Sequence, residues 1–264
     1  IIILMLIFSY AVGGTVEVLF AVIRKEEINE GFLVTGFIFL LILPPGIPLW
    51  LVTVGIAFGV LIGKEIFGGT GRNLFNPALV GRCFLALGYP AHATSHWIEP
   101  AVRGWGRLAE PLRLIAPEAI TTAKPLVAAK GGELALPLDL FLGRVTGSAG
   151  ETSALAVLLG GVFLISVGVA NWRTVVSILI SFVGLGAILH TALPSVVNPV
   201  WFNLLSGGIL FGAFFMATDP VSSPVTTSGK WVYGIIICLL TILIRNFSGY
   251  VEGAMIAILL GNIT

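Results

Sequence analysis

Long apolar runs separated by short polar turns are the feature of this sequence that most restricts its fold. Hydropathy predicts about nine membrane spans, at 1–23, 31–45, 47–66, 74–90, 151–170, 174–193, 201–217, 231–247 and 250–264. Only 10% of the 264 residues are charged, against about 25% in a soluble domain, so the chain cannot cover a globule with polar surface. We therefore expect an all-α integral membrane protein that crosses the lipid bilayer many times.

Two interruptions divide the chain. The run 31–45 ends in "LPPGIP", which predicts a broken or half-buried helix. The segment 91–150 is broken by prolines and glycines, and it predicts one long extramembrane loop. This loop separates two predicted membrane repeats, 1–90 and 151–264, and we expect both outer ends to be truncated. The repeat is suggested by "FGVLIGKEIFGG" and "FGAFFMATDPVS", and duplicated bundles commonly place an ion path between their halves.

The short loops predict the orientation in the membrane. Lysine or arginine occurs in the turns 24–31, 64–72, 171–173 and 228–230, whereas 194–200 and 248–250 have neither. Basic short loops face the cytoplasm in most membrane proteins. We therefore expect the first group of turns on the cytoplasmic side and the 91–150 loop on the outer side.

The turn "GGTGRNLFNP", Gly68 to Pro77, lies between two apolar runs. It lacks the Gly-Lys-Ser/Thr ending of a P-loop. Pro77 suits a first helical turn, and Asn73 and Asn76, three residues apart, are predicted to share a face and to donate and accept hydrogen bonds. Two interpretations stay open here: a helix cap with a tight turn, or an amide pair for a polar heteroaromatic ligand such as a flavin ring.

Two carboxylates are candidates for an ion path. Glu17 lies within an apolar run, and a carboxylate at membrane depth is costly and usually functional. The alternative is an interfacial glutamate close to Arg24 and Lys25. Asp219, in "ATDPVSSP", is either a second such carboxylate or part of an Asp-Pro turn.

Other residues allow less specific predictions. Arg82 and Glu252 also fall at membrane depth and are predicted to pair or to line a cavity. Gly13 and Gly14 predict a close approach of helices. No metal-ligand or disulfide spacing, and no basic cluster for nucleic acid, is found in the sequence; the residues without a predicted role are Cys83, Cys238, His92, His96 and His190.

Three blocks in this order, "RKEEINEGFLVTGFIFLLILP", "GKEIFGGTGRNLFNPALVGRCFL" and "FGAFFMATDPVSSPVTTSGKWVYG", carry a family resemblance. Together they resemble the NqrB/RnfD family, whose members are membrane subunits of the Na+-translocating NADH:quinone reductase and of the Rnf ferredoxin:NAD reductase. The resemblance covers almost the whole chain, and "EINEGF" and "GGTGRN" favour the quinone-reductase branch. It implies about ten helices in the full family member.

The resemblance implies three sites near the cytoplasmic side. Asn73 and Asn76 match asparagines in the region that holds a non-covalent riboflavin. Glu17 and Asp219 match carboxylates that are linked to sodium uptake. The glycine pair 13–14 matches the region where ubiquinone is thought to bind.

The resemblance also implies a flavin in the outer loop. In the family, FMN is joined by a phosphoester to a threonine within a Ser/Thr-Gly-Ala-Thr sequence, and the matching residues are Thr121, Thr122, Ala123 and Lys124. Lysine has no hydroxyl, so the usual bond cannot form at Lys124. Three explanations stay open: non-covalent FMN with Lys124 pairing its phosphate, attachment to a neighbouring threonine, or a sequence error.

The function implied by the resemblance is that of a membrane subunit of a sodium-pumping NADH:ubiquinone oxidoreductase in the bacterial inner membrane. It would carry electrons through FMN and riboflavin to ubiquinone with Na+ export, together with partner subunits, and would not be active alone. An Rnf-type subunit is the alternative within the family. A flavin-free secondary transporter explains the repeat and the carboxylates, but it does not explain the matched blocks.

Overall fold

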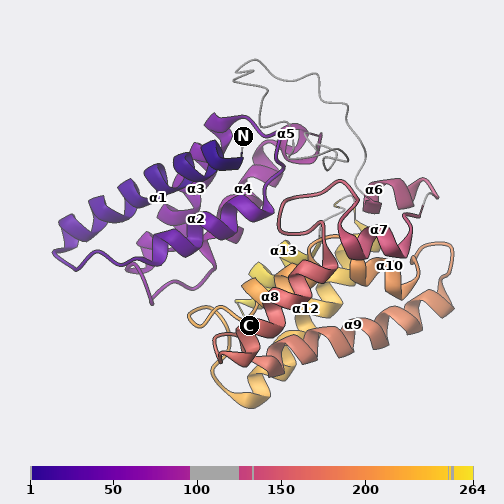
Figure 1. Cartoon of the computed structure of the whole chain (residues 1–264). Helices are drawn as coiled ribbons and strands as arrows, with labels where there is room; N and C mark the ends of the chain where they lie inside the picture. Colours follow the sequence, from indigo (N-terminus) through magenta and orange to yellow (C-terminus); the bar gives the residue numbers. More distant parts are fainter. Residues whose placement is uncertain (1, 96–124, 133, 249, 251–252, 264) are drawn as a thin grey trace.

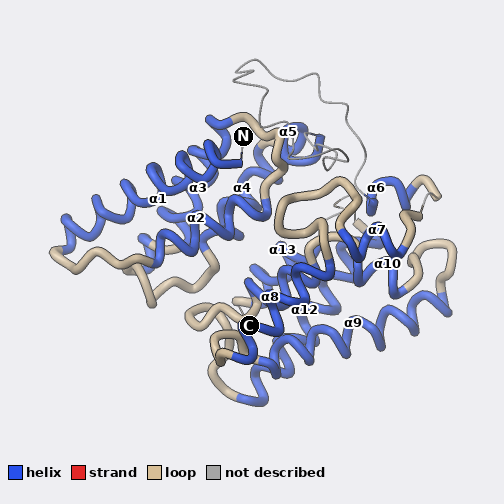
Figure 2. Tube along the Cα trace, viewed as in Figure 1, coloured by secondary structure: helices blue, strands red, loops and turns tan. Residues whose placement is uncertain are grey.

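The computed structural model describes residues 2–95, 125–132, 134–248, 250 and 253–263 (Figures 1 and 2). All regular elements within these ranges are helical, and they contain no strand. In chain order the elements are α1 (Ile2–Arg24), α2 (Gly31–Ile42), α3 (Leu49–Gly63), η1 (Glu65–Phe67), α4 (Pro77–Gly88), α5 (Pro90–Ser95), α6 (Pro125–Lys130), α7 (Pro137–Leu142), α8 (Ala154–Ser166), α9 (Trp172–Ala192), α10 (Val200–Leu205), α11 (Ile209–Phe211), η2 (Gly212–Met216), α12 (Thr227–Phe247) and α13 (Gly253–Gly261).

Four helical stretches of the described chain are long and apolar enough to cross a bilayer. They are Ile2–Arg24, Leu49–Phe67, Trp172–Ala192 and Thr227–Phe247, with 19 to 23 residues each. An α-helix rises about 1.5 Å per residue, so about 20 residues span the hydrocarbon layer. Many large apolar side chains on these helices face outward, among them Val22, Ile180 and Ile188, each more than 60% exposed. The chain is a helical membrane protein.

The other predicted spans form shorter helices, so the prediction of nine full spans is met only in part. The helices α2, α4 and α8 have 12, 12 and 13 residues. Helix α2 ends at Ile42, and Leu43 is extended with ψ of 151°, because a residue that precedes proline is disfavoured in helical conformation.

The predicted span 201–217 is interrupted in the structure. Helix α10 ends before Ser206, and Gly207 has a positive φ of 67°. The chain then continues through the short α11 into the π-helical η2. A residue with positive φ stops the helical hydrogen-bond ladder, and glycine adopts that conformation at little cost, so the Gly207–Gly208 pair breaks this segment.

The helices form two groups with the same order of packing partners. In the first, α1 packs against α2 and α3, and α4 packs against α2 and α3. In the second, α9 packs against α10, η2 and α12, and α13 packs against η2 and α12. By its packing partners, α3 of the first group corresponds to α12 of the second. The similar sequence segments that begin at Phe58 and Phe211 would instead make α3 correspond to α11. The duplication itself stays a prediction.

The two groups are joined by one hydrophobic core. Its buried side chains come from both halves, including Phe39 and Leu51 of the first and Phe182 and Ile237 of the second. Helix α4 contacts α13, and the Gly150 N–H donates a hydrogen bond to the Leu41 carbonyl at 2.8 Å. The indigo and purple helices of Figure 1 therefore pack directly on the orange and yellow ones.

The four basic turns lie at one end of the bundle. In Figure 1 the C-terminal end of α1, the turn after η1 and the N-terminal ends of α9 and α12 lie toward the left and lower left, whereas α6, α7 and α10 lie toward the right. The sequence predicts this grouping from alternating spans. The segment 91–150 was predicted to be one long loop, but its described part contains the helices α6 and α7. These helices pack on α10 through Leu126, Leu140 and Phe202.

Candidate functional site

A buried ion pair joins the C-terminal half of α1 to the end of α3. The Lys64 Nζ lies 2.7 Å from Glu17 Oε1, and the Thr70 hydroxyl donates to the same oxygen at 3.1 Å. Glu17 is 4% exposed and Lys64 is 3% exposed. Glu17 Oε2 is buried and has no hydrogen-bond partner among the described residues. Both hydrogen bonds from the described residues therefore reach the same carboxylate oxygen, Oε1.

A second pair lies beside the first. Arg24 Nη1 is 2.7 Å from Glu65 Oε2, and Arg24 Nη2 donates to the Glu65 carbonyl. The sequence offered Arg24 and Lys25 as neighbours of Glu17. The structure corrects the ion-pair partner: Lys64, at the end of α3, pairs with Glu17, whereas the nearby Arg24 pairs with Glu65.

A polar pocket of about 100 Å³ opens between these pairs. Such a volume holds several water molecules, since one needs about 10–15 Å³. Nowhere in the described chain do three or more His, Cys, Asp or Glu side chains gather in a way that would hold a metal ion tightly. The pocket is lined by Glu17, Ala21, Arg24, Glu26, Glu27, Asn29, Glu65, Gly69 and Thr70.

The turn between η1 and α4 closes this pocket. Gly69 has a φ of +92°, and a Cβ there would lie 3.0 Å from Arg24 Nη1. A side chain at 69 would therefore be strained and would press on the Arg24–Glu65 pair. Glycine adopts a positive φ at little cost, and the turn uses this conformation at Gly69 next to Thr70, whose hydroxyl reaches Glu17.

The two asparagines of the same turn have local hydrogen bonds. Asn76 is the N-cap of α4, and its Oδ1 accepts from the amides of Ala78 and Leu79 at 3.0 and 3.4 Å. Asn73 Nδ2 donates to the Phe75 carbonyl at 2.9 Å. Pro77 begins the helix as predicted. The predicted shared helical face is wrong, because both asparagines precede the helix.

Each of these two side-chain amides uses only one of its two polar groups in these hydrogen bonds. Asn76 keeps Nδ2, a donor, and Asn73 keeps Oδ1, an acceptor, and neither group makes a hydrogen bond within the described structure. The ring of Phe75 lies edge-on to Phe67, with centroids 6.0 Å apart. One donor and one acceptor near two aromatic rings are the kinds of group that can bind the polar edge of a flavin ring.

Asp219 is bound within its own turn. Its Oδ1 accepts from the Val221 amide at 3.2 Å, and its Oδ2 accepts from the Ser222 hydroxyl at 2.9 Å. The side chain is half-buried. This is the local Asp-Pro turn that the sequence offered as the alternative to an ion-path carboxylate.

Gly13 and Gly14 allow α1 to approach its neighbours. A Cβ on Gly13 would lie 3.1 Å from Ile56 of α3, and one on Gly14 would lie 3.1 Å from the Phe32 ring of α2. Both glycines therefore serve helix packing, as the sequence predicts. This packing brings α1 and α3 close enough for Glu17 to reach Lys64.

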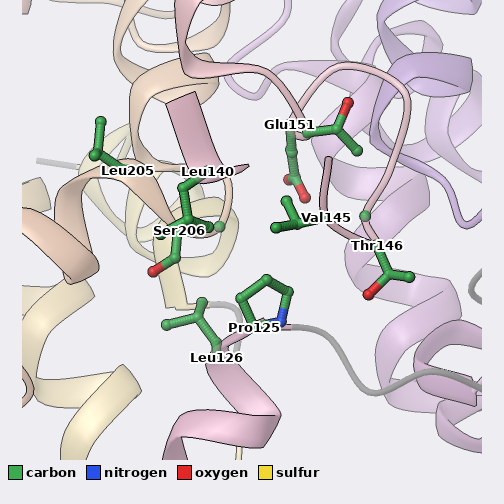
Figure 3. A pocket seen from close by; sticks show the side chains of 11 residues that line it. Pro125, Leu126, Leu140, Val145, Thr146, Glu151, Leu205 and Ser206 are labelled. Atoms are coloured by element: carbon green, nitrogen blue, oxygen red, sulfur yellow. The ribbon is translucent and has the colours of Figure 1, made fainter. Parts of the chain in front are cut away.

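A different pocket lies beside α6, α7 and α10, toward the right in Figure 1, and Figure 3 shows it from close by. Pro125, Leu140, Val145, Glu151 and Ser206 are among the residues that line it. Its volume is about 20 Å³, which is room for about one water molecule. An isoalloxazine ring does not fit there.

The predicted FMN attachment residues lie outside the described residues. These residues are Thr121, Thr122 and Lys124, which directly precede Pro125 of the pocket. Glu252 and His96 also fall outside, so the predicted pair of Arg82 with Glu252 stays a prediction.

Comparison with known proteins identifies the family. A family model described as "NQR2, RnfD, RnfE family" matches residues 2–264. The chain belongs to this family. Among curated proteins, it is 46% identical over 265 residues to the B subunit of the Na(+)-translocating NADH-quinone reductase of Azotobacter vinelandii, covering 97% of this chain and 62% of that protein. The proteins of the same name from Stutzerimonas stutzeri and Klebsiella pneumoniae are each 45% identical, over 97% and 96% of this chain.

The family resemblance that the sequence blocks predicted is thereby confirmed. The chain spans about 62% of the length of the curated NQR2, RnfD, RnfE family members it matches. The family assignment rests on the whole chain and does not depend on any single motif.

Several buried charged residues of this family member were missed by sequence reasoning. Glu151, 8% exposed, interacts electrostatically with both Arg82 and Arg245. Arg245, 4% exposed, also donates from Nη1 to the Asn203 carbonyl at 2.7 Å. Arg245 falls inside the predicted span 231–247, and Lys64 falls where the predicted span 47–66 overlaps the basic turn 64–72. A charge within or at the end of a span is itself a signal of a buried partner.

Proposed function

We propose that this chain is part of the NqrB subunit of a Na+-translocating NADH:quinone reductase in a bacterial inner membrane. The observation that carries the proposal is the similarity to B subunits of that complex along nearly the whole chain, at 46% identity for one of them. The chain would work with the other subunits of the complex and would have no NADH oxidation activity alone.

The sodium path is proposed to include Glu17. The carboxylate lies at a pocket with several acidic groups, and Oε2 is left without a hydrogen bond from the described residues. A cation there would interact with a negative charge on a nearby reduced flavin, since Coulomb interactions are strong where water is excluded. Asp219 is proposed as a weaker member of the path, because its oxygens are already bound within the turn.

Riboflavin is proposed to bind beside the η1–α4 turn. Asn76 Nδ2 and Asn73 Oδ1 would bond the ring, and Phe75 would contact its face or edge. When bound, the flavin supplies one- or two-electron transfer, and the protein sets its position and polarity. Ubiquinone is proposed to bind near Gly13 and Gly14, on the same helix as Glu17.

The FMN site is proposed on the family resemblance alone, because the pocket beside Pro125 is too small for a flavin ring. In-gel flavin fluorescence and mass spectrometry of the 114–130 peptide would identify the attachment. FMN on Thr121 or Thr122 means a shifted site, a threonine at 124 means a sequence error, and release of FMN on denaturation means non-covalent binding.

The proposed function is tested on the purified complex that contains the full-length subunit. We expect NADH-driven ubiquinone reduction that Na+ stimulates and that Glu17→Gln abolishes. Electron transfer between ferredoxin and NAD+ without quinone reduction would favour the Rnf-type alternative. A complex free of any flavin would favour the transporter alternative.

A further inference from the structure

The Lys64 ammonium lies against Glu17, the carboxylate that is proposed to bind sodium. The two groups come from different helical segments, are 2.7 Å apart, and are both more than 95% buried. We propose that Lys64 is a tethered competitor of sodium: it neutralises Glu17 when no sodium is bound and moves aside when sodium binds. This inference rests on the proposed sodium path and assigns Lys64 as the residue that sets its affinity.

The two carboxylate oxygens of Glu17 differ in a way that supports competition. Oε1 accepts from both Lys64 and Thr70, whereas the buried Oε2 accepts from no described residue. A buried oxygen of a carboxylate normally has a partner, because leaving it unpaired is costly. An oxygen-coordinated cation is the partner that this free position suits, since hard cations prefer carboxylate and hydroxyl oxygens. Thr70 can offer its oxygen lone pair to the same ion.

The charges around the pocket favour a cation as the ligand. Four carboxylates line it, those of Glu17, Glu26, Glu27 and Glu65. They outnumber the cations that lie against them, which are Arg24 in the lining and the partners of Glu17 and Glu26, Lys64 and Arg72. An anion would meet this excess of negative charge. Sodium bound to Glu17 together with Lys64 would place two positive charges close together at a buried carboxylate, so the two cations compete.

The structure contains an alternative acceptor for the ammonium. Lys64 Nζ lies 3.4 Å from the site where a Gly31 Cβ would be, and Asn29 Oδ1 lies 3.1 Å from that same site. The Asn29 oxygen, which accepts from the Gly31 amide at 2.8 Å, therefore lies beside the same glycine as the ammonium and has a second lone pair. Lysine has a flexible stem, so Lys64 can shift toward Asn29 without backbone movement. A residue at 31 larger than glycine would block this shift.

The test measures the sodium concentration for half-maximal turnover of the purified complex, with choline chloride keeping ionic strength constant. Lys64→Met removes the competitor, and we expect the half-saturating sodium concentration to fall about tenfold, a 1.4 kcal/mol effect. Lys64→Arg keeps the charge and can bind both carboxylate oxygens, so we expect that concentration to rise. A merely structural lysine would not give opposite shifts in these two variants.

Arg72→Met is the matched control. Arg72 is in the same turn, and its guanidinium lies 3.6 Å from Glu26 in an exposed pair. The substitution removes the same charge and leaves the Glu17 pair intact, so we expect sodium dependence like that of the wild type. If it shifts the half-saturating concentration as much as Lys64→Met does, a general surface-charge effect replaces the competition.

The outcomes separate this inference from the proposed function. Sodium-dependent wild-type turnover with no shift in either Lys64 variant would overturn the competition and leave the function standing. Sodium-independent turnover of the wild type would overturn the proposed function itself. If Lys64→Met does not assemble, the expected rise for Lys64→Arg remains a complete test, and its absence would equally refute the inference.

Discussion

Glu17 and Asp219 are two carboxylates that the sequence treats alike, and the structure gives them opposite environments. Glu17 is buried and bonded to Lys64, 47 residues away in sequence. Asp219 is half-buried and bonded to groups two and three residues away. The difference shows that a carboxylate near a membrane can be held by the tertiary fold or by its own turn.

The two environments also differ in what a substitution removes. Loss of the Glu17 charge leaves a lysine buried without its counter-charge, whereas loss of the Asp219 charge leaves a turn in which asparagine can accept the same backbone bond. Stability effects should therefore separate the two residues even if both affect sodium transport.

Glu17→Gln is expected to have the largest effect. Breaking a buried ion pair by neutralising one partner costs about 3–5 kcal/mol, and the variant should lose sodium-stimulated turnover. The measurement is unfolding of the detergent-solubilised protein together with NADH:quinone activity. The double variant Glu17→Gln with Lys64→Met should recover most of the stability without the sodium response. A single variant as stable as the wild type would contradict the expected cost of leaving Lys64 buried without its counter-charge.

Arg24→Met should have the next largest effect on unfolding. It removes a charged pair and a bond to the Glu65 carbonyl, and a hydrogen bond to a charged group contributes about 1.5–3 kcal/mol. Because the Arg24 side chain is 25% exposed, water compensates part of the loss, and we expect about 1–2 kcal/mol. Arg24→Lys should retain part of the pair, and equal losses in both variants would contradict this explanation.

Asn76→Ala should cost about 1 kcal/mol, the usual effect of removing a helix N-cap. Asn76→Asp keeps the accepting oxygen for Ala78 and Leu79 but lacks the Nδ2 donor. If Asn76 bonds riboflavin, the aspartate variant should keep its thermal stability and lose flavin, which extraction and chromatography would quantify. Retention of riboflavin in the aspartate variant would remove Asn76 from the flavin site.

Asp219→Asn should have the smallest effect on stability, within about 0.5 kcal/mol, as for a substitution outside the core. The asparagine Oδ1 can still accept from the Val221 amide. A loss of sodium-dependent turnover with unchanged unfolding would assign Asp219 to the sodium path. Unchanged turnover would restrict Asp219 to the turn.

The positions of most helices and the family could be predicted from the sequence, whereas the lengths of the helices and the partners of the buried charges could not. Apolar runs at the right spacing predicted where the helices lie, because burial of backbone groups in a bilayer demands helices. They failed at 201–217, where the Gly207–Gly208 pair breaks the helix. The block around Asn73 and Asn76 carried the family, but the shared helical face was wrong, because Asn76 ends the turn as an N-cap.

The sequence by itself determined the class of this protein and the end of the bundle at which its basic turns lie, and it marked Glu17 as a candidate without deciding its burial. These follow from composition and local pattern, which act over a few residues. Only the tertiary structure decided that Lys64 neutralises Glu17, that Arg24 binds Glu65, and that Glu151 interacts with both Arg82 and Arg245. Such pairs depend on how closely helices such as α1 and α3 approach each other, and that distance is set by the side chains that face Gly13 and Gly14 across the helices.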